Sequence, residues 1–231
     1  MATVILLRHA RSTANGAGVL AGRQPGVTLS DRGVEQASAL VDRLAGVPVA
    51  AVVTSPLERC RQTLAPLLDR LGLDPVVEPD LAEVDYGQWT GREIKELYAE
   101  PLWSVVQQHP SAAVFPDGEG LATVQARAVA AIRAHDARVT AEHGPRAVWL
   151  ACSHGDVIKA VLADALGVHL DGFQRIVVDP ASVSVVQYTE TRPFVLRVND
   201  NGGDLSVLAP PPEKTEEPPS SDAVVGGATG S

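Results

Sequence analysis

The chain has 231 residues, of which 45% are apolar, and its formal net charge is −9. This length and composition favour one globular α/β domain with a substantial core. The acidic balance argues against a nucleic-acid partner, because nucleic-acid binding depends on a basic surface.

The acidic excess is concentrated at the carboxyl end. Six acidic residues and one basic residue lie from Asp200 onward, so that segment carries −5 and the rest of the chain −4. Residues 209–231 are rich in Pro, Glu, Ser and Gly and contain no aromatic residue. Such a composition buries too little apolar surface to fold. We therefore expect a folded domain over residues 1–208 and a disordered tail over 209–231, whose role the sequence leaves open.

Several kinds of segment and site are not expected. No apolar run reaches about 18 residues, and no basic n-region precedes an apolar h-region, so we expect no membrane partner and a cytoplasmic location. Cys60 and Cys152 each fall inside a predicted regular element, which argues against a disulfide framework. Neither has acidic neighbours with metal-ligand spacing.

The hydrophobic pattern alternates between strands and helices along the chain. Thr3 to Leu7 is an uninterrupted apolar run, typical of a strand buried on both faces. A Gly- and Ala-rich loop follows, through Gly22. Similar runs or alternating patterns predict further strands at 49–53, 75–78, 147–152, 182–188 and 194–198. The sequence therefore predicts an α/β fold, a three-layer α/β/α sandwich with a mostly parallel central sheet.

Start and stop signals delimit the helices. Ser30 is a good N-cap, while Ser55–Glu58 and Thr90–Glu93 have the spacing of capping boxes. Gly72 and Gly144 are placed to end helices. The expected helices cover residues 31–44, 56–71, a stretch opening at Thr90, 121–143 and 156–166.

Polar residues follow three of the predicted strands. Arg8 and His9 end the first strand, and His154 ends the fourth. Alone, such residues are also typical polar caps of a strand. Arg59 lies in the first turn of the helix after the second strand, where a cation is unfavourable unless an anion compensates. If the sheet brings these ends together, as open α/β sheets do, the site is cationic and suits a phosphate dianion.

Carboxylates follow the third strand. Glu83 and Asp85 alternate with apolar neighbours, and each could be an acid/base group or a loop acid whose partners are local. The remaining histidines have no such context, and we expect them at the surface: His109, His135, His143 and His169.

Four motifs together resemble the histidine phosphatase superfamily, in its phosphoglycerate-mutase-like branch. They are Arg8-His9-Ala10-Arg11-Ser12 with Asn15, Ser55 to Thr63, Glu83 with Tyr86 to Gly91, and Ser153-His154-Gly155. Each motif alone is common, but here the four stand in the family's order, each at an expected element boundary. The resemblance spans residues 3 to about 198.

The resemblance implies a role for each residue. His9 would be the nucleophile that becomes phosphohistidine, with Arg8, Arg59 and His154 around the phosphoryl group and Glu83 as proton donor and acceptor. Ser12, Asn15 and the Gly155 amide would help to hold the phosphate. No metal or other cofactor is implied.

This chemistry sets conditions on two groups. His9 must attack as the neutral imidazole, with one ring nitrogen held by an acceptor such as a backbone carbonyl. Glu83 must first be protonated and then act as a base, so we expect burial to raise its pKa and activity to peak at acidic or near-neutral pH.

Some positions depart from the family pattern. Ala10 stands where glycine is common, and Ala14 replaces an aromatic residue found in mutases. Arg11 stands where Glu or Gln is frequent, and we expect it to add a cation at the pocket rim. Asp156 stands where mutases have Asn, although it is also a typical helix-start residue.

Phosphatase activity is favoured over mutase activity. Residues 96–125 contain no Lys or Arg, and a pocket covered by this segment should prefer one phosphate and a less polar alcohol. The expected substrate is a small phosphorylated metabolite of unspecified identity. The alternatives are a cofactor-dependent phosphoglycerate mutase and a non-catalytic phosphate-binding module of the same fold. A metal hydrolase is less favoured because the arginines oppose a cation. A homodimer is one option for the assembly.

Overall fold

The computed structural model describes residues 1–203. The predicted domain boundary at 208 and the predicted tail over 209–231 lie outside the described residues. Within residues 1–203, no helix has the length and apolar character needed to cross a membrane.

A six-stranded sheet with the order β3-β2-β4-β1-β5-β6 organises the fold. Its strands are β1 (Thr3–Arg8), β2 (Val49–Thr54), β3 (Val76–Val77), β4 (Val148–Ser153), β5 (Val183–Gln187) and β6 (Phe194–Asp200). The pairs β1–β4, β2–β4 and β2–β3 are parallel, whereas β5 is antiparallel to both of its neighbours. Only β5 therefore runs against the others, which confirms the mostly parallel sheet.

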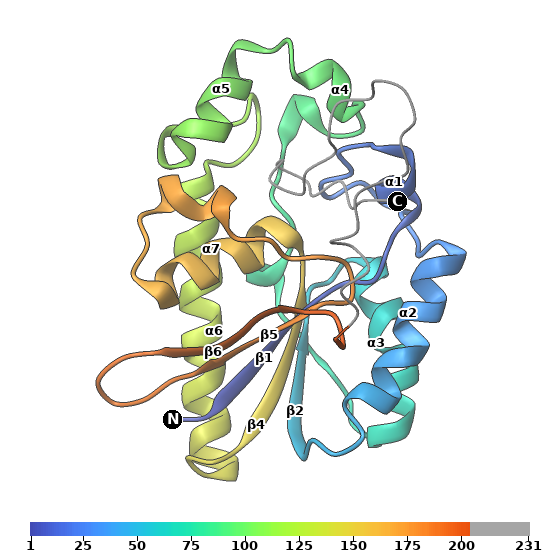
Figure 1. The fold of residues 1–231 in the computed structure, drawn as a ribbon, viewed down its shortest axis with the longest axis vertical. Coiled ribbons are helices and arrows are strands. Elements are labelled where there is room, and N and C mark those ends of the chain that lie inside the picture. Colours follow the sequence, from blue (N-terminus) through green and yellow to red (C-terminus); the bar gives the residue numbers. More distant parts are fainter. Residues whose placement is uncertain (204–231) are drawn as a thin grey trace.

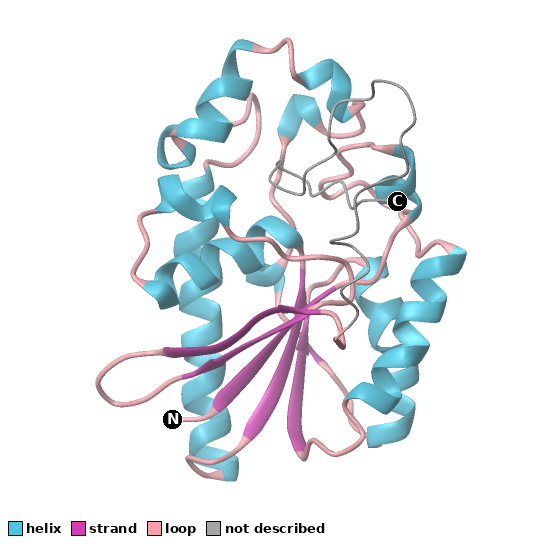
Figure 2. Ribbon diagram, in the orientation of Figure 1, coloured by secondary structure: helices cyan, strands magenta, loops and turns pink. Residues whose placement is uncertain are grey.

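Helices cover both faces of this sheet. Figure 1 shows α2 (Asp31–Arg43) and α3 (Glu58–Leu71) on one side, and α6 (Leu121–His143) and α7 (Gly155–Leu166) on the other. The three layers are also plain when helices and strands are coloured separately (Figure 2). The short helices are α1 (Thr13–Ala17), α4 (Ile94–Leu97) and α5 (Pro101–Gln108), and α4 and α5 lie apart at the top of the view. The predicted α/β/α sandwich is thus confirmed.

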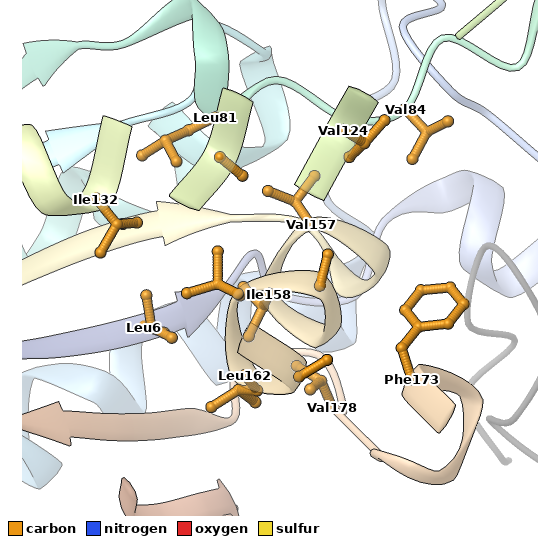
Figure 3. Packing of buried hydrophobic residues seen from close by; sticks show 14 of the residues in the cluster. Leu6, Leu81, Val84, Val124, Ile132, Val157, Ile158, Leu162, Phe173 and Val178 are labelled. Atoms are coloured by element: carbon orange, nitrogen blue, oxygen red, sulfur yellow. The ribbon is translucent and has the colours of Figure 1, made fainter. Parts of the chain in front are cut away.

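The alternation of side chains in β1 shows how the layers are joined. Val4 and Leu6 pack into a cluster with residues of α6 and α7 (Figure 3), whereas Ile5 and Leu7 pack into a second cluster with residues of α2 and α3. Because successive side chains of a strand point to opposite faces, a run without polar residues is required here.

The predicted start of α2 is confirmed, whereas the predicted starts of α3 and α4 are wrong. Ser30 caps α2 as expected, since its hydroxyl accepts from the Gly33 amide. Both predicted capping boxes are wrong. Ser55 is held by a hydrogen bond from its amide to Cys152 O, so α3 begins only at Glu58. Glu93 is held by a bridge to Val19, so α4 begins at Ile94.

Two local expectations near the first and sixth helices also fail. The segment after β1 was expected to be a loop, yet it contains α1, where Ser12 and Asn15 form a reciprocal capping box. His135 was expected at the surface, but it is buried and its Nε2 lies 2.8 Å from Glu78 Oε2. His109, His143 and His169 are exposed as expected.

The loop that carries Glu83 is braced by a second loop. The Gln88 amide donates to Pro116 O, and the Glu119 amide donates to Asp85 O. Gly87 lies between these bonds with φ +50°, and a Cβ there would collide with Pro116 O. A side chain at this position would therefore force the two loops apart.

Gly87→Ala should lower the free energy of unfolding by about 2–4 kcal/mol, because it combines left-handed backbone strain with a collision against backbone. Urea unfolding followed by circular dichroism measures this loss. Gly46→Ala is the matched control, since nothing lies within 4 Å of its added Cβ. Equal stability of Gly87→Ala and the wild type would contradict the braced-loop interpretation.

Candidate active site

The sheet brings the predicted site residues to one edge. β4 lies between β1 and β2, with Arg8 opposite Ser153 and Thr54 opposite Cys152. His9, Ser55 and His154, the residues that follow these three strands, therefore meet at the carboxyl ends. This is the place where open α/β sheets hold their ligands.

His9 is buried, and its ring orientation is fixed. Its Nδ1 lies 2.7 Å from Ala10 O, and because a carbonyl only accepts, Nδ1 carries the proton. Nε2 is thus the unprotonated nitrogen, and it accepts a hydrogen bond from Arg59 Nε at 3.3 Å. Burial, followed by the charges of Arg59 and Arg8, lowers the pKa of His9 well below its usual value. The expected neutral imidazole held by a backbone carbonyl is confirmed.

The guanidinium groups of Arg59 and Arg8 line the same cavity as His9. Arg59 contacts His9, and its Nη2 also lies 2.9 Å from Gly22 O and 3.1 Å from His154 Nδ1. Arg8 donates from Nη1 to Val178 O at 2.6 Å. At Gly155 a Cβ would lie 3.3 Å from Arg8 Cζ, so this glycine leaves room for the guanidinium. Both arginines are almost fully buried, which makes the site cationic.

His154 is also held in one tautomer. Because the Arg59 guanidinium only donates, His154 Nδ1 accepts, and Nε2–H then donates to Ser55 Oγ at 2.7 Å. Burial and the Arg59 charge lower the pKa of His154 well below its usual value. Ser55 was missed as a site residue because its spacing to Glu58 imitates an N-cap. Cys60 and Cys152 are free and buried, and Cys60 Sγ lies 3.6 Å from His154 Nε2.

The Glu83 carboxyl lies near His154, and its pKa is raised. Oε1 accepts from the Val84 amide at 2.9 Å, and Oε2 lies 3.9 Å from His154 Nδ1. Burial, followed by the negative charge of Asp156, raises the pKa of Glu83 to about 7, although Arg59 opposes this. Since the same environment favours neutral His154, the 3.9 Å contact is not a salt bridge. The expected rise in pKa is confirmed.

The main chain of Glu83 is held by two arginines that sequence reasoning did not single out. Arg23 Nε and Arg127 Nη2 both donate to Glu83 O, at 2.8 and 3.3 Å. Glu119 bonds to both guanidiniums. Asp85, the other candidate acid, accepts from the Gly87 amide at 3.0 Å and is a loop acid with a local partner.

The cavity beside His9 differs in part from the prediction. Ser12 and Asn15 line it, as expected, while Asn15 Oδ1 accepts from Ser12. None of residues 96–125 lines it, because Trp103 and Phe115 pack inward on Trp89. Arg11 is not among the lining residues either, and its expected place as a cation at the pocket rim stays a prediction. The lining residues are Arg8, His9, Ser12, Asn15, Val19, Leu20, Ala21, Gly22, Arg59, Glu83 and Tyr86.

Within residues 1–203, no group of three or more His, Cys, Asp or Glu side chains is placed to hold a metal ion.

The sequence model of the histidine phosphatase superfamily (branch 1) matches residues 4–201.

Individual relatives cover most of the chain. Phosphoserine phosphatase 1 of Hydrogenobacter thermophilus is 31% identical over 205 residues, which cover 86% of this chain and 92% of that protein. The Yersinia pestis protein named "Probable phosphoglycerate mutase GpmB" is 28% identical over 91% of this chain and 97% of its own. The solved α-ribazole phosphatase of Shigella flexneri superposes with a TM-score of 0.74 at 26% identity, covering 86% and 96% of the two chains.

The raised pKa of Glu83 predicts a pH-dependent stability. A carboxyl whose native pKa exceeds its unfolded value stabilises the fold at low pH, and this contribution is lost as pH rises from about 4.5 to about 7. Between pH 4.5 and 7.5 the wild type should lose about 3 kcal/mol of unfolding free energy that Glu83→Gln retains. Urea unfolding of both proteins at these pH values measures this difference. Glu35→Gln, at an exposed position on α2, should track the wild type. A gap between wild type and Glu83→Gln that stays constant with pH would contradict the prediction.

Proposed function

The chain belongs to the histidine phosphatase superfamily, and from this premise we propose that it hydrolyses phosphomonoesters through a phosphohistidine on His9, without a metal ion. One observation carries the proposal. His9 Nε2 is unprotonated because Nδ1–H is bonded to Ala10 O, and its lone pair faces the Arg59 guanidinium, from which it accepts a hydrogen bond in a buried site.

The first step forms a bond between His9 Nε2 and the phosphorus while the bond from phosphorus to the alcohol oxygen breaks. Arg8 and Arg59 offset the charge on the phosphoryl oxygens, which is the main task of a catalyst for this transfer. Glu83 donates its proton to the leaving alcohol. Its pKa of about 7 keeps it protonated in mildly acidic solution, which supports this role.

The second step returns the enzyme to its starting state. Glu83, now a carboxylate, takes a proton from a water molecule whose oxygen attacks the phosphorus. The bond from phosphorus to Nε2 breaks, and phosphate leaves. Positioned acid/base groups of this kind typically contribute about 10²–10⁴-fold to the rate. Since Glu83 must be protonated first and His9 neutral, we expect activity to peak at acidic to near-neutral pH.

The binding residues follow from the cavity. Ser12 and Asn15 line it, and because Asn15 Oδ1 is used by Ser12, the Asn15 amide nitrogen is the atom that can donate to phosphate. Gly155 does not line the cavity. Its amide begins α7, and the positive end of that helix dipole favours an anion.

Hydrolysis is favoured over mutase chemistry by the walls of the cavity. Apart from Arg8 and Arg59, which serve the transferred phosphoryl group, the lining residues within 1–203 include no Lys or Arg. Val19, Leu20 and Ala21 form the adjacent wall, so this wall offers no cation to a second phosphate or a carboxylate. We therefore propose that the substrate is a small metabolite with one phosphate on a weakly polar alcohol, and that water receives the phosphoryl group.

His9→Ala should reduce hydrolysis of an aryl phosphate by about 10⁴-fold or more, and should abolish acid-labile labelling of the protein with radioactive phosphate. His169→Ala is the control, because that side chain is 74% exposed and distant from the cavity lining. A non-catalytic phosphate-binding module would show no turnover even as wild type. Unchanged hydrolysis by His9→Ala would remove the phosphohistidine from the mechanism.

Phosphate release should dominate over isomerisation. With 3-phosphoglycerate and its bisphosphate primer we expect little mutase product, and with an aryl phosphate we expect steady release of phosphate. Coupled enzyme assays and phosphate detection measure the two rates. Equal rates with and without EDTA are expected, because the two guanidiniums supply the positive charge. Fast isomerisation, or loss of activity in EDTA that zinc or magnesium restores, would overturn the corresponding part of the proposal.

A further inference from the structure

A buried charged chain leads from the cavity wall into the helical layer beneath it. The Tyr86 hydroxyl donates to Asp156 Oδ2 at 2.7 Å, and Lys159 Nζ lies 3.6 Å from Asp156 Oδ1. Lys159 Nζ also donates to Gln174 Oε1 at 3.3 Å and lies 5.7 Å from the centre of the Phe173 ring. The exposed fractions of Tyr86, Asp156 and Lys159 do not exceed 1%.

The position of Asp156 on its helix does not explain this burial. An acid in the first turn of α7 interacts favourably with the helix dipole, but it does so equally well at the surface. Burying a carboxylate and an ammonium is costly, and such pairs often stabilise a fold no more than apolar residues would. The chain ends at Tyr86, which lines the cavity next to Glu83.

We propose that Asp156 is a positioning residue for the reaction: anchored by Lys159, its carboxylate holds Tyr86 in the cavity wall and supplies a fixed negative charge that keeps the proton on Glu83. This inference rests on the proposed acid/base role of Glu83. It assigns a purpose to an acid that would otherwise be an ordinary helix start.

The charges around Glu83 come from several elements. Arg8 on β1 and Arg59 on α3 favour the carboxylate form, and neutral His154 lies 3.9 Å away. Arg23 and Arg127 reach the Glu83 carbonyl and are themselves paired with Glu119. Asp156 on α7 is the acid whose charge raises the pKa of Glu83, second only to burial. Without it, burial alone would oppose the charges of the two site arginines, and the pKa of Glu83 would be lower.

Asp156→Asn tests the charge. In a ¹³C NMR titration, with the Glu83 signal assigned from Glu83→Gln, the Glu83 midpoint should fall by about one pH unit. The upper limb of the kcat/KM profile should shift equally, giving about a tenfold loss at pH 8 and little change at pH 5. Asp156→Glu should restore the midpoint. Asp164→Asn, an acid on the same helix paired with Arg133, should leave it unchanged. A folded Asp156→Asn protein whose midpoint stays within about 0.3 pH units of wild type would overturn the charge role.

A second pair of variants covers the case in which Asp156→Asn leaves Lys159 buried without its partner and does not fold. Asp156→Asn/Lys159→Met removes both charges and should lower the midpoint by a smaller amount, because loss of the Lys159 cation partly offsets loss of the Asp156 charge. Tyr86→Phe keeps the charge but loses the anchor, so KM should rise about threefold to tenfold while the Glu83 midpoint stays in place. An unchanged KM would overturn the anchoring role, and a midpoint lowered as far as in Asp156→Asn would overturn the charge role.

Failure of this inference is distinguishable from failure of the proposed function. The NMR titration requires no turnover, so it reports on Asp156 even if His9→Ala proves active. If His9→Ala is inactive and the Glu83 midpoint does not respond to Asp156, only the inference about Asp156 fails.

Discussion

The site depends on the burial of two guanidiniums beside two imidazoles. Arg59 donates to His9 Nε2 and to His154 Nδ1, and its charge, with desolvation, holds both rings in the neutral form. A neutral imidazole is nucleophilic, whereas an imidazolium is not. In the proposed mechanism the same guanidinium also offsets the charge of the phosphoryl group.

Strand order makes this arrangement possible. Because β4 separates β1 from β2, the residues that follow the three strands meet at one edge although they are about 50 and 100 positions apart in sequence. Ser55 Oγ accepts a hydrogen bond from His154 Nε2–H, and the Ser55 amide donates to Cys152 O, which holds this residue outside α3. The delayed start of α3 at Glu58 is therefore a consequence of the site and places Arg59 in the first turn.

The sequence was sufficient for what local pattern determines. The apolar runs located the strands. The polar residues at the strand ends and in the first turn of the following helix singled out His9, His154 and Arg59, which the structure brings together. What it did not reveal depends on contacts between distant segments. Ser55 has the spacing of an N-cap, and α1 is stabilised by a Ser12–Asn15 capping box within a Gly-rich stretch. Asp156 has the composition of a helix start, and only its bond to Tyr86, 70 positions away, connects it to the cavity.

The residues proposed for the chemistry and those that would contact the alcohol lie on different parts of the fold. The groups proposed for the chemistry lie at strand ends and on the braced Glu83 loop, where backbone bonds fix them. The wall that an alcohol would meet is made by Val19, Leu20 and Ala21, which belong to the connection between α1 and α2. Loop positions can change without disturbing the sheet. In the proposed function, recognition of the phosphate is therefore physically separate from recognition of the alcohol. Tyr86 is the exception, since it lines the cavity and is bonded to Asp156. If Asp156 acts on Glu83 as proposed, its charge is coupled to the shape of the wall.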